Sequence, residues 1–406
     1  MSFTSFVTRT ARKDLRTSIT ARSISVFGDE VAVVTLTLRV HDSGGGPALV
    51  AAVLAAGMLP VALMAAPAGQ LVDRLDSRTL LLTVGAAQTA LCVALALARG
   101  IAATLILLTA LGALQAVTQA TWQALVPRIV GDENLAAAMG RVQAAQTLAF
   151  IAAPALAGVL TGWLGSGSAL LLDAATFLAV CAAALTMRTR RRPASNPAQD
   201  RARATEGLRF LRRDPVVAPL VACLAVFALL GLMVTVVEVF LVRDTLGASS
   251  SWYGALLAAW AGGLVLGALG AGRASSTVLR VRWFVTAAVV LNVALAGFAL
   301  ARTPWQLVPV SVLGGIANGV INVTAGAVVM TRAPEAIRGR VAAALGAVAS
   351  AAGFVSLLVG GALATVLDPR AVFALSGVLA AISVLATGRR AVRAAMSAPP
   401  PTPEPL

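Results

Sequence analysis

Histidine and lysine are almost absent from this chain of 406 residues, which contains one of each, His41 and Lys13. A single histidine excludes metal sites built on several histidines, and the sole lysine is not part of a Gly-x-x-x-x-Gly-Lys-Ser/Thr nucleotide-binding loop. The three cysteines (Cys92, Cys181 and Cys223) stand alone within apolar stretches, where cysteine behaves as a small hydrophobic residue. We therefore predict no metal, no cofactor and no enzymatic activity.

Charged residues are also scarce, at 12% of the chain, whereas 58% of the residues are hydrophobic. A soluble domain averages about 25% charged and about 45–50% apolar residues, so the composition excludes a soluble enzyme, a secreted disulfide-stabilised domain and a disordered protein. The net charge of +15 comes almost entirely from arginine, in short segments between apolar runs. Arginine in such positions meets lipid headgroups, which predicts a protein of the lipid bilayer that binds no nucleic acid.

A membrane-spanning helix needs about 20 mostly apolar residues. Dividing the chain at its charged, Pro- and Gly-containing loops predicts twelve of them, at about 18–40, 46–70, 79–98, 102–126, 136–162, 167–187, 215–242, 252–272, 283–301, 305–331, 341–366 and 370–388. Asp76, Asp214-Pro215, Pro304 and Asp368-Pro369 stand where helices are expected to begin, because Asp caps a helix N-terminus and Pro fits its first turn.

The positions of the basic residues predict the orientation, because cytoplasmic loops carry the excess of Lys and Arg. If the N-terminus is cytoplasmic, the loops on the opposite side contain only Arg39, Arg99, Arg243, Arg302 and Arg370. The remaining basic residues fall on the cytoplasmic side, except Arg22 within the first helix. One crossing more or fewer would destroy this asymmetry, so both termini are expected in the cytoplasm.

The longest loop, 188–214, divides the chain into two predicted six-helix halves, 1–187 and 215–395. Its first part is expected to be flexible, and 206–213 is expected to form an amphipathic surface helix whose arginines bind anionic lipid. The Pro-rich tail, 396–406, is expected to be disordered. Two halves in the same orientation indicate an internal repeat, with a substrate site between them near the middle of the bilayer.

The loop after the second predicted helix reads Gly69-Gln70-Leu71-Val72-Asp73-Arg74-Leu75-Asp76-Ser77-Arg78. It resembles the signature loop of the major facilitator superfamily, Gly-x-Leu-x-Asp-Arg-x-Gly-Arg-Arg. The matching residues are Gly69, Leu71, Asp73, Arg74 and Arg78, whereas Asp76 and Ser77 depart from the pattern. A carboxylate at a helix C-terminus is disfavoured by the helix dipole, so Asp73 needs a partner. The resemblance implies that this partner is the start of the eleventh helix, in a latch between the halves on the cytoplasmic side.

The fifth predicted helix contains Ala153-Pro154-Ala155-Leu156-Ala157-Gly158. This resembles the Gly-Pro-x-x-Gly-Gly motif of antiporters, of which Pro154 and Gly158 remain. Proline allows a kink and small residues allow another helix to approach, for which Gly263-x-x-x-Gly267 on the eighth helix is the expected neighbour. Plain helix packing is the alternative interpretation. With stretches such as Glu206-Gly207-Leu208-Arg209-Phe210, the chain resembles, over nearly its whole length, the macrolide-efflux and enterobactin-exporter branch of drug:proton antiporters.

Carboxylates within the bilayer are candidates for function, because a charge there costs at least about 2.5–3.5 kcal/mol. They are Asp29 and Glu30 halfway along the first helix, Asp173 in the sixth and Glu238 near the outer end of the seventh. The resemblance implies that the first, fourth, seventh and tenth helices line the cavity, where loss of hydration favours the protonated form of a carboxyl group. Asp29 or Glu30 is the expected proton carrier, followed by Glu238. Asp173 is expected to form hydrogen bonds between helices.

Uncharged polar residues form a predicted substrate surface on the fourth and tenth helices, at Gln115, Gln119, Trp122, Gln123, Asn318 and Asn322. The three glutamines are four residues apart and share one helix face, which cannot be turned cheaply toward lipid. This polar face either lines the cavity or forms hydrogen bonds with neighbouring helices.

These features predict a monomeric secondary transporter of the bacterial cytoplasmic membrane. It would export small amphipathic molecules, such as drugs, macrolides or siderophores, in exchange for protons. An importer or uniporter of a small metabolite is the alternative within the transporters, because the motif in the fifth helix is changed. A membrane sensor with a transporter fold is the other alternative, although it would be expected to have lost acids such as Asp29 and Asp73.

Overall fold

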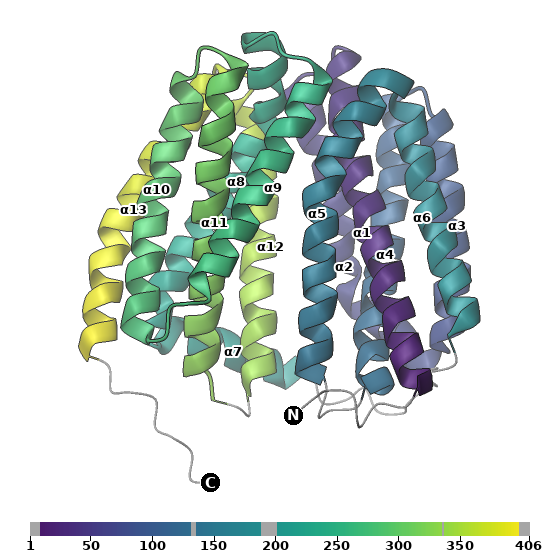
Figure 1. The fold of residues 1–406 in the computed structure, drawn as a ribbon, viewed down its shortest axis with the longest axis horizontal. Helices are drawn as coiled ribbons and strands as arrows, with labels where there is room; N and C mark the ends of the chain where they lie inside the picture. Colours follow the sequence, from purple (N-terminus) through teal and green to yellow (C-terminus); the bar gives the residue numbers. More distant parts are fainter. Residues whose placement is uncertain (1–8, 131–134, 188–200, 335–336, 398–406) are drawn as a thin grey trace. The chain divides into compact units, whose positions relative to one another are not determined.

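The computed structural model describes residues 9–130, 135–187, 201–334 and 337–397 (Figure 1). Within these ranges the chain forms helices and short connections, without a strand. The helices are α1 (Arg9–Asp42), α2 (Pro47–Arg74), α3 (Ser77–Leu97), α4 (Ile101–Val130), α5 (Leu135–Leu164), α6 (Ser166–Thr186), α7 (Arg201–Arg213), α8 (Val217–Phe240), α9 (Ser250–Ala271), α10 (Thr277–Leu300), α11 (Pro304–Arg332), α12 (Arg338–Leu363) and α13 (Pro369–Ser397). A π-helical turn, η2 (Leu241–Thr245), continues α8.

The predicted class, an all-α membrane protein, is confirmed. Each predicted span is a helix, and ten of the described helices are long and apolar enough to cross a membrane. The other two predicted spans are α1, which contains several charged residues, and α5, whose apolar part covers only Ala152–Leu164. The count of twelve crossings therefore stays a prediction.

The predicted helix starts are confirmed. The carboxylate of Asp76 accepts hydrogen bonds from backbone N–H groups at the start of α3, and that of Asp214 does so at the start of α8. Helices α11 and α13 begin at Pro304 and Pro369. Short-range signals of this kind depend on neighbouring residues only, which is why a sequence can reveal them.

Two helices are longer than their apolar stretches. Helix α1 begins at Arg9 instead of near residue 18, and α13 extends to Ser397 instead of residue 388. Alanine and arginine have high helix propensity, so a helix continues where hydrophobic residues become sparse. The apolar run predicts the part of a helix that suits the bilayer and not the helix end.

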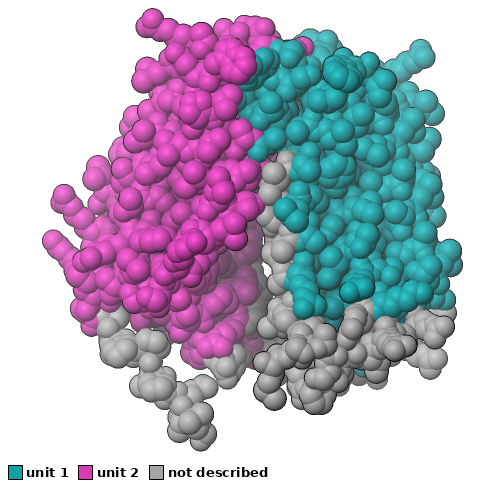
Figure 2. All heavy atoms as spheres, viewed as in Figure 1, with its two compact units in different colours: residues 1–197, 249–258 teal, residues 198–248, 259–406 magenta. Residues whose placement is uncertain are grey.

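The structure divides into two compact units, coloured separately in Figure 2. The first contains residues 1–197 and 249–258, and the second contains residues 198–248 and 259–406. In the first unit α1 packs against α5 and α6, α2 against α4, and α3 against α4 and α6. In the second unit α10 packs against α11 and α13, and α8 against α12 and α13.

The helix expected near 206–213 is present as α7, within the second unit. Leu211 is only 2% exposed and packs in a cluster with residues of α8, α11 and α12, whereas Leu208 is 42% exposed. Glu206 forms an ion pair with Arg340 at the start of α12. Contacts with α12 thus hold α7. Residues 188–200 and 398–406, for which flexibility and disorder were predicted, lie outside the described residues.

Helices α9 and α11 approach each other so closely in the second unit that their backbones touch. A Cβ atom added to Gly267 would lie 2.8 Å from the carbonyl carbon of Ile316, and one added to Gly315 would lie 2.9 Å from that of Trp260. The prediction that Gly263 and Gly267 face the fifth helix is therefore wrong, although the same helix does contact α5 at a different residue, Gly254. Glycine spacing indicates a close contact, but it does not identify the helix on the other side.

Candidate functional site

A chain of side-chain hydrogen bonds links α1, α4 and α3 inside the first unit. The Nε2 group of Gln115 on α4 donates to Oδ2 of Asp29 on α1, at 2.5 Å. The Nε2 group of Gln88 on α3 donates to Oε1 of Gln115, at 2.8 Å. The hydroxyl of Thr118, one turn along α4, donates to Oε1 of Gln88, at 3.0 Å. Asp29 therefore stands at the accepting end of a chain that connects three helices.

A second carboxylate lies next to this chain. Asp173 on α6 is fully buried, and its oxygens accept hydrogen bonds from the thiol of Cys92 on α3, at 3.3 Å, and from the hydroxyl of Thr176, at 3.2 Å. Gly28, the neighbour of Asp29, faces Asp173 and Thr176. An added Cβ atom at Gly28 would overlap the Asp173 carboxylate and lie 2.8 Å from Cγ2 of Thr176. The missing side chain of Gly28 thus lets α6 bring Asp173 against the backbone of α1.

Arg22 contributes positive charge to the same region. It precedes Asp29 by seven residues, nearly two full turns, so the two side chains leave the same face of α1. Its Nη1 atom is buried and has no hydrogen-bond partner among the described residues. Arg22 and Asp29 interact electrostatically, and Asp173 and Glu30 act on Asp29 with the opposite sign. A buried carboxylate with a nearby guanidinium is cheaper to keep in apolar surroundings than either charge alone.

The other two predicted carriers lie outside this network. Glu30 is half-buried and follows Asp29 on α1, about 100° further around the helix. Glu238 is half-buried near the end of α8, in the second unit. Neither carboxylate forms a hydrogen bond or ion pair with another described residue. Of the four candidate acids, Asp29 and Asp173 are therefore the two that the fold brings together.

The predicted substrate residues have different surroundings. On α4, Gln115 belongs to the hydrogen-bond chain, Gln119 is half-buried and Gln123 is exposed. Trp122 is 3% exposed and packs in a hydrophobic cluster of the first unit. On α11, the amide of Asn322 donates to Oδ1 of Asn318, at 2.8 Å. The polar face of α4 thus contributes both to bonding between helices and to accessible surface, and its cavity role stays a prediction.

The residues of the signature-like loop divide between two helix ends. Gly69, Leu71, Asp73 and Arg74 belong to the last turns of α2, whereas Arg78 lies in the first turn of α3. The Arg78 guanidinium donates to the carbonyl oxygens of Ala184, Leu185 and Met187, at 2.8, 2.8 and 2.6 Å, and so closes the C-terminus of α6. A cation is favoured at the negative end of a helix dipole. Asp76, which departs from the family pattern, has a local role as the N-cap of α3.

The antiporter-like motif marks a close contact between helices. Pro154 and Gly158 on α5 are buried, and the first turns of α9 belong to the same unit as α5. A Cβ atom added to Gly158 would lie 2.9 Å from the carbonyl oxygen of Ser250 and 3.0 Å from Cα of Gly254. One added to Gly254 would lie 2.6 Å from the carbonyl oxygen of Pro154. The two remaining motif residues are thus at a contact with no room for side chains.

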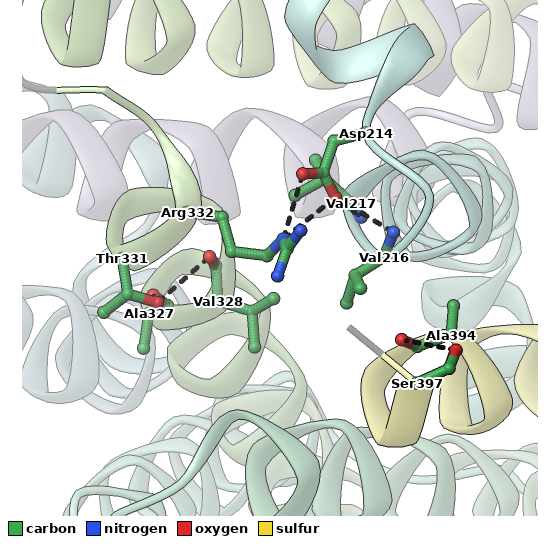
Figure 3. Close-up of polar contacts among 9 residues, drawn as sticks. All are labelled: Asp214, Val216, Val217, Ala327, Val328, Thr331, Arg332, Ala394 and Ser397. Carbon is green, nitrogen blue, oxygen red and sulfur yellow. Dashed lines mark hydrogen bonds and ion pairs between the residues drawn. The ribbon is translucent and has the colours of Figure 1, made fainter. Parts of the chain in front are cut away.

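Charged groups of the second unit are bonded at helix ends. Figure 3 shows the Arg332 side chain at the end of α11 turned toward Asp214, which precedes α8. The Nε atom of Arg332 lies 3.0 and 2.9 Å from the two oxygens of Asp214. Oδ1 of Asp214 also accepts the backbone N–H groups of Val216 and Val217, both at 2.9 Å. One carboxylate therefore caps α8 and ties it to α11.

Sequence reasoning missed Gln88, Thr118, Cys92 and Thr176 as members of the polar network. A signal was available for Gln88, because a glutamine within an apolar span needs a hydrogen-bond partner inside the protein. No comparable signal marks the other three residues, since threonine can bond to its own helix and cysteine packs as an apolar residue.

Solved structures show which class of protein has this fold. The chain is similar to a mutant of the nucleoside transporter NupG, with a TM-score of 0.75, 13% identity, and coverage of 94% of this chain and 99% of that one. A POT family peptide transporter in an auto-inhibited form gives a TM-score of 0.72 at 13% identity, over 94% and 97% of the two chains. A bacterial homolog of the human lysosomal transporter Spinster gives 0.68 at 16% identity, over 96% of each. The chain therefore has the fold of these membrane transporters.

Sequence comparison then identifies the family. The model of the transmembrane secretion effector family matches residues 8–402, and the chain belongs to this family of major facilitator transporters. It is also 28% identical to the multidrug efflux pump Tap of Mycolicibacterium fortuitum over 387 residues, which are 90% of this chain and 93% of that protein. The predicted superfamily and its fold are thereby confirmed, and the expectation that the protein is not an enzyme agrees with both.

Proposed function

We propose that this transporter exports small amphipathic molecules from a bacterial cell in exchange for protons, by alternating access between its two halves. The similarity to Tap supports an outward direction, because that protein is an efflux pump. The distribution of arginine supports both termini in the cytoplasm. We further propose the bacterial cytoplasmic membrane as its location and the monomer as its working form.

The observation that carries the proposal is the half-buried carboxylate of Asp29 at the end of a hydrogen-bond chain that leads to the buried residues Gln88 and Thr118. A carboxylate inside a membrane protein is costly, and such groups mark proton pathways more often than structural sites. The 2.5 Å bond from Gln115 stabilises the charged form of Asp29, whereas the apolar surroundings favour the neutral form. These opposing influences allow Asp29 to bind a proton in one state of the transporter and release it in the other.

Exchange follows if substrate and proton compete for Asp29. A substrate with a cationic group is attracted by the charged carboxylate of Asp29 and repelled by the nearby guanidinium of Arg22, whereas protonation of Asp29 removes the attraction. The two ligands then occupy the site alternately, which is the requirement for antiport. Asp173, Glu30 and Glu238 are the alternative carriers, and each can be tested by the same substitution of carboxyl by amide.

Other residues have proposed roles in binding and gating. Gln119 and Gln123 on α4 are proposed to contact substrate in the first unit, and Asn318 and Asn322 on α11 in the second. Trp122, also predicted for this role, is buried and is no longer proposed. The loop residues Gly69, Leu71, Asp73, Arg74 and Arg78 are the proposed cytoplasmic gate. Pro154 and Gly158 are the proposed flexible point of α5, because proline removes a backbone hydrogen bond and the contact with α9 leaves no side chain to rearrange.

The test uses purified protein in liposomes with an imposed pH gradient. Macrolides, lipophilic cations and catecholate siderophores are added one at a time, and substrate-induced proton movement is recorded. We expect one class to drive proton movement opposite to its own, and we expect Asp29→Asn to lower the rate at least tenfold. Glu30→Gln, which neutralises the adjacent carboxylate, is the matched control and should retain most of the rate.

Three results would contradict the proposal. Full activity of Asp29→Asn would show that another group carries the proton. Movement of substrate and proton in the same direction would indicate an importer. Transport that does not respond to the pH gradient would indicate a uniporter.

A further inference from the structure

We propose that Gln88 and Thr118 are positioning residues for Asp29: together with Gln115 they form a hydrogen-bond chain whose direction reverses when Asp29 gains or loses its proton. The inference rests on the proposed function, since it takes Asp29 as the proton carrier. It adds two residues to the coupling machinery, one of them on a helix that carries none of the predicted coupling or substrate-surface residues.

The observed direction of the chain suits a charged Asp29. Each step donates toward the carboxylate, from Thr118 to Gln88, from Gln88 to Gln115 and from Gln115 to Asp29. A glutamine amide has a donating NH2 group at one corner and an accepting oxygen at the other. The orientation of one amide therefore dictates the orientation of the next, over two helix-to-helix contacts.

The opposite direction suits a protonated Asp29. Its O–H would donate to Oε1 of Gln115, whose NH2 group would donate to Oε1 of Gln88. The NH2 group of Gln88 would then donate to the hydroxyl oxygen of Thr118. This reversal needs only two amide rotations and an end group that both donates and accepts. Threonine is such a group.

The hydroxyl of Thr118 has an acceptor available in the reversed state. In a helix, a threonine hydroxyl can donate to the backbone carbonyl one turn earlier, which for Thr118 is that of Leu114. Thr121, in the next turn of α4, forms this bond with the carbonyl of Val117, at 2.7 Å. In both directions, each link of the chain therefore joins a donor to an acceptor.

Burial favours reversal of the whole hydrogen-bond chain over reversal of only part of it. Gln88 is 0% exposed and Thr118 is 3% exposed, so water cannot replace a missing partner at these two residues, whereas Gln115 and Asp29 are half-buried. An unpaired amide in apolar surroundings is unfavourable, so Gln88 is expected to rotate together with its neighbours in the chain. Protonation of Asp29 on α1 would thus change the hydrogen bonds between α4 and α3.

Other charged groups near Asp29 do not replace this chain. Arg22 and Glu30 share α1 with Asp29, and Asp173 faces it from α6, with Cys92 of α3 bonded to Asp173. The described parts of the neighbouring helices α2, α4 and α5 carry titratable groups only toward their ends, at Asp73, Arg74, Arg128 and Arg141. Among the residues that the structure describes, Gln115 forms the side-chain hydrogen bond with the Asp29 carboxylate.

The experiment is infrared difference spectroscopy of the full-length protein in lipid, titrated with acid, with isotope-labelled glutamine side chains. Asp29→Asn identifies the carboxyl band of Asp29, and Gln88→Met identifies the amide band of Gln88. We expect the Gln88 band to shift at the same midpoint as the Asp29 band, although the two residues do not touch. A merely structural glutamine would give a band that does not change with pH.

Substitutions within the hydrogen-bond chain distinguish a chain that reverses from a purely structural role of Gln88. Gln115→Met removes the link, so the Gln88 band should stop responding while Asp29 still titrates. Thr118→Val should also abolish the response of Gln88, and Thr118→Ser should restore it. Thr121→Val makes the same change one turn away and should leave both bands as in the native protein.

The outcomes distinguish the inference from the proposed function. If Asp29 titrates and Gln88 does not follow, the inference is overturned and Asp29 can still be the carrier. If no band disappears in Asp29→Asn and this variant retains proton-coupled transport, the proposed carrier fails and the inference fails with it. Should Gln115→Met not fold, the Thr118→Val and Thr118→Ser pair decides the question.

Discussion

The two units place their polar side chains differently. In the first unit, bonded polar groups lie in the middle of helices, at Asp29, Gln88, Gln115 and Asp173. Both units have charged groups bonded at helix ends, such as Arg78 in the first and the pair of Asp214 and Arg332 in the second, but among the described membrane-spanning helices only those of the first unit have hydrogen-bonded carboxylates in mid-helix. Close backbone contacts occur in both units, between α5 and α9 in the first and between α9 and α11 in the second.

This difference indicates a division of labour. Charges at helix ends satisfy helix dipoles and free backbone groups, a structural task that leaves little to titrate. Carboxylates in mid-helix serve no such need and must be maintained at a cost in free energy. We therefore propose that the proton-carrying residues lie in the first unit. We expect substitutions in the second unit to act chiefly on stability, through the packing of its helices. Three substitutions, from the largest expected effect to the smallest, test this assignment.

Packing of α9 against α11 should give the largest effect on stability. In Gly267→Ala the added methyl group meets the backbone of Ile316, which cannot rotate away, and we expect a loss of about 2–3 kcal/mol. Gly270→Ala adds the same group to the same helix where nothing lies within 4 Å. This control should be neutral or slightly stabilising.

The measurement is thermal unfolding in detergent, followed by a thiol-reactive dye that labels Cys92 and Cys223, which are buried in the folded protein. Equal unfolding temperatures for the two alanine variants would show that α9 and α11 are not in backbone contact.

The ion pair at the ends of α8 and α11 should have an intermediate effect. Asp214→Ala loses both the bond to Arg332 and the cap of α8, and we expect a destabilisation of about 2 kcal/mol. Asp214→Asn keeps an N-cap acceptor and should lose only about 1 kcal/mol. The difference between the two variants in denaturant unfolding measures the cap alone. Altered proton coupling in Asp214→Ala or Asp214→Asn would contradict the assignment of proton coupling to the first unit.

The contact of Gly28 with α6 should have the smallest effect on stability and a further effect on function. Gly28→Ala presses on the side chains of Asp173 and Thr176, which can move, so we expect a loss of about 1–2 kcal/mol. Because Asp173 lies beside Asp29, proton-coupled transport should also slow. Gly231→Ala, at an open position of α8 in the second unit, should change neither property. Normal transport by Gly28→Ala would show that Asp173 has no part in coupling.

Features set by neighbouring residues could be predicted from the sequence. Apolar runs located the twelve predicted spans, each of which is a helix, and Asp76, Asp214 and Pro304 marked helix starts, because spans and caps depend on local composition. The signature-like loop indicated the superfamily. The same kind of evidence identified Asp29 and Asp173 as unusual, since a carboxylate within an apolar span needs an explanation.

Features set by the register between helices could not be predicted. The bond from Gln88 to Gln115 depends on how α3 slides along α4, and no pattern within either helix records that position. The same is true of Gly28 against Asp173, and of Arg78, which bonds to carbonyls more than 100 residues further along the chain. Gly263 and Gly267 were assigned to the wrong neighbour for this reason.

Proton release on substrate binding tests the assignment to the first unit most directly. A substrate found in the liposome assay is added in saturating amount to purified protein in weakly buffered detergent solution, and a pH dye records the protons released. We predict proton release from the native protein and from Glu238→Gln, and no proton release from Asp29→Asn. Release from Asp29→Asn together with its loss in Glu238→Gln would place the proton carrier in the second unit and contradict the account.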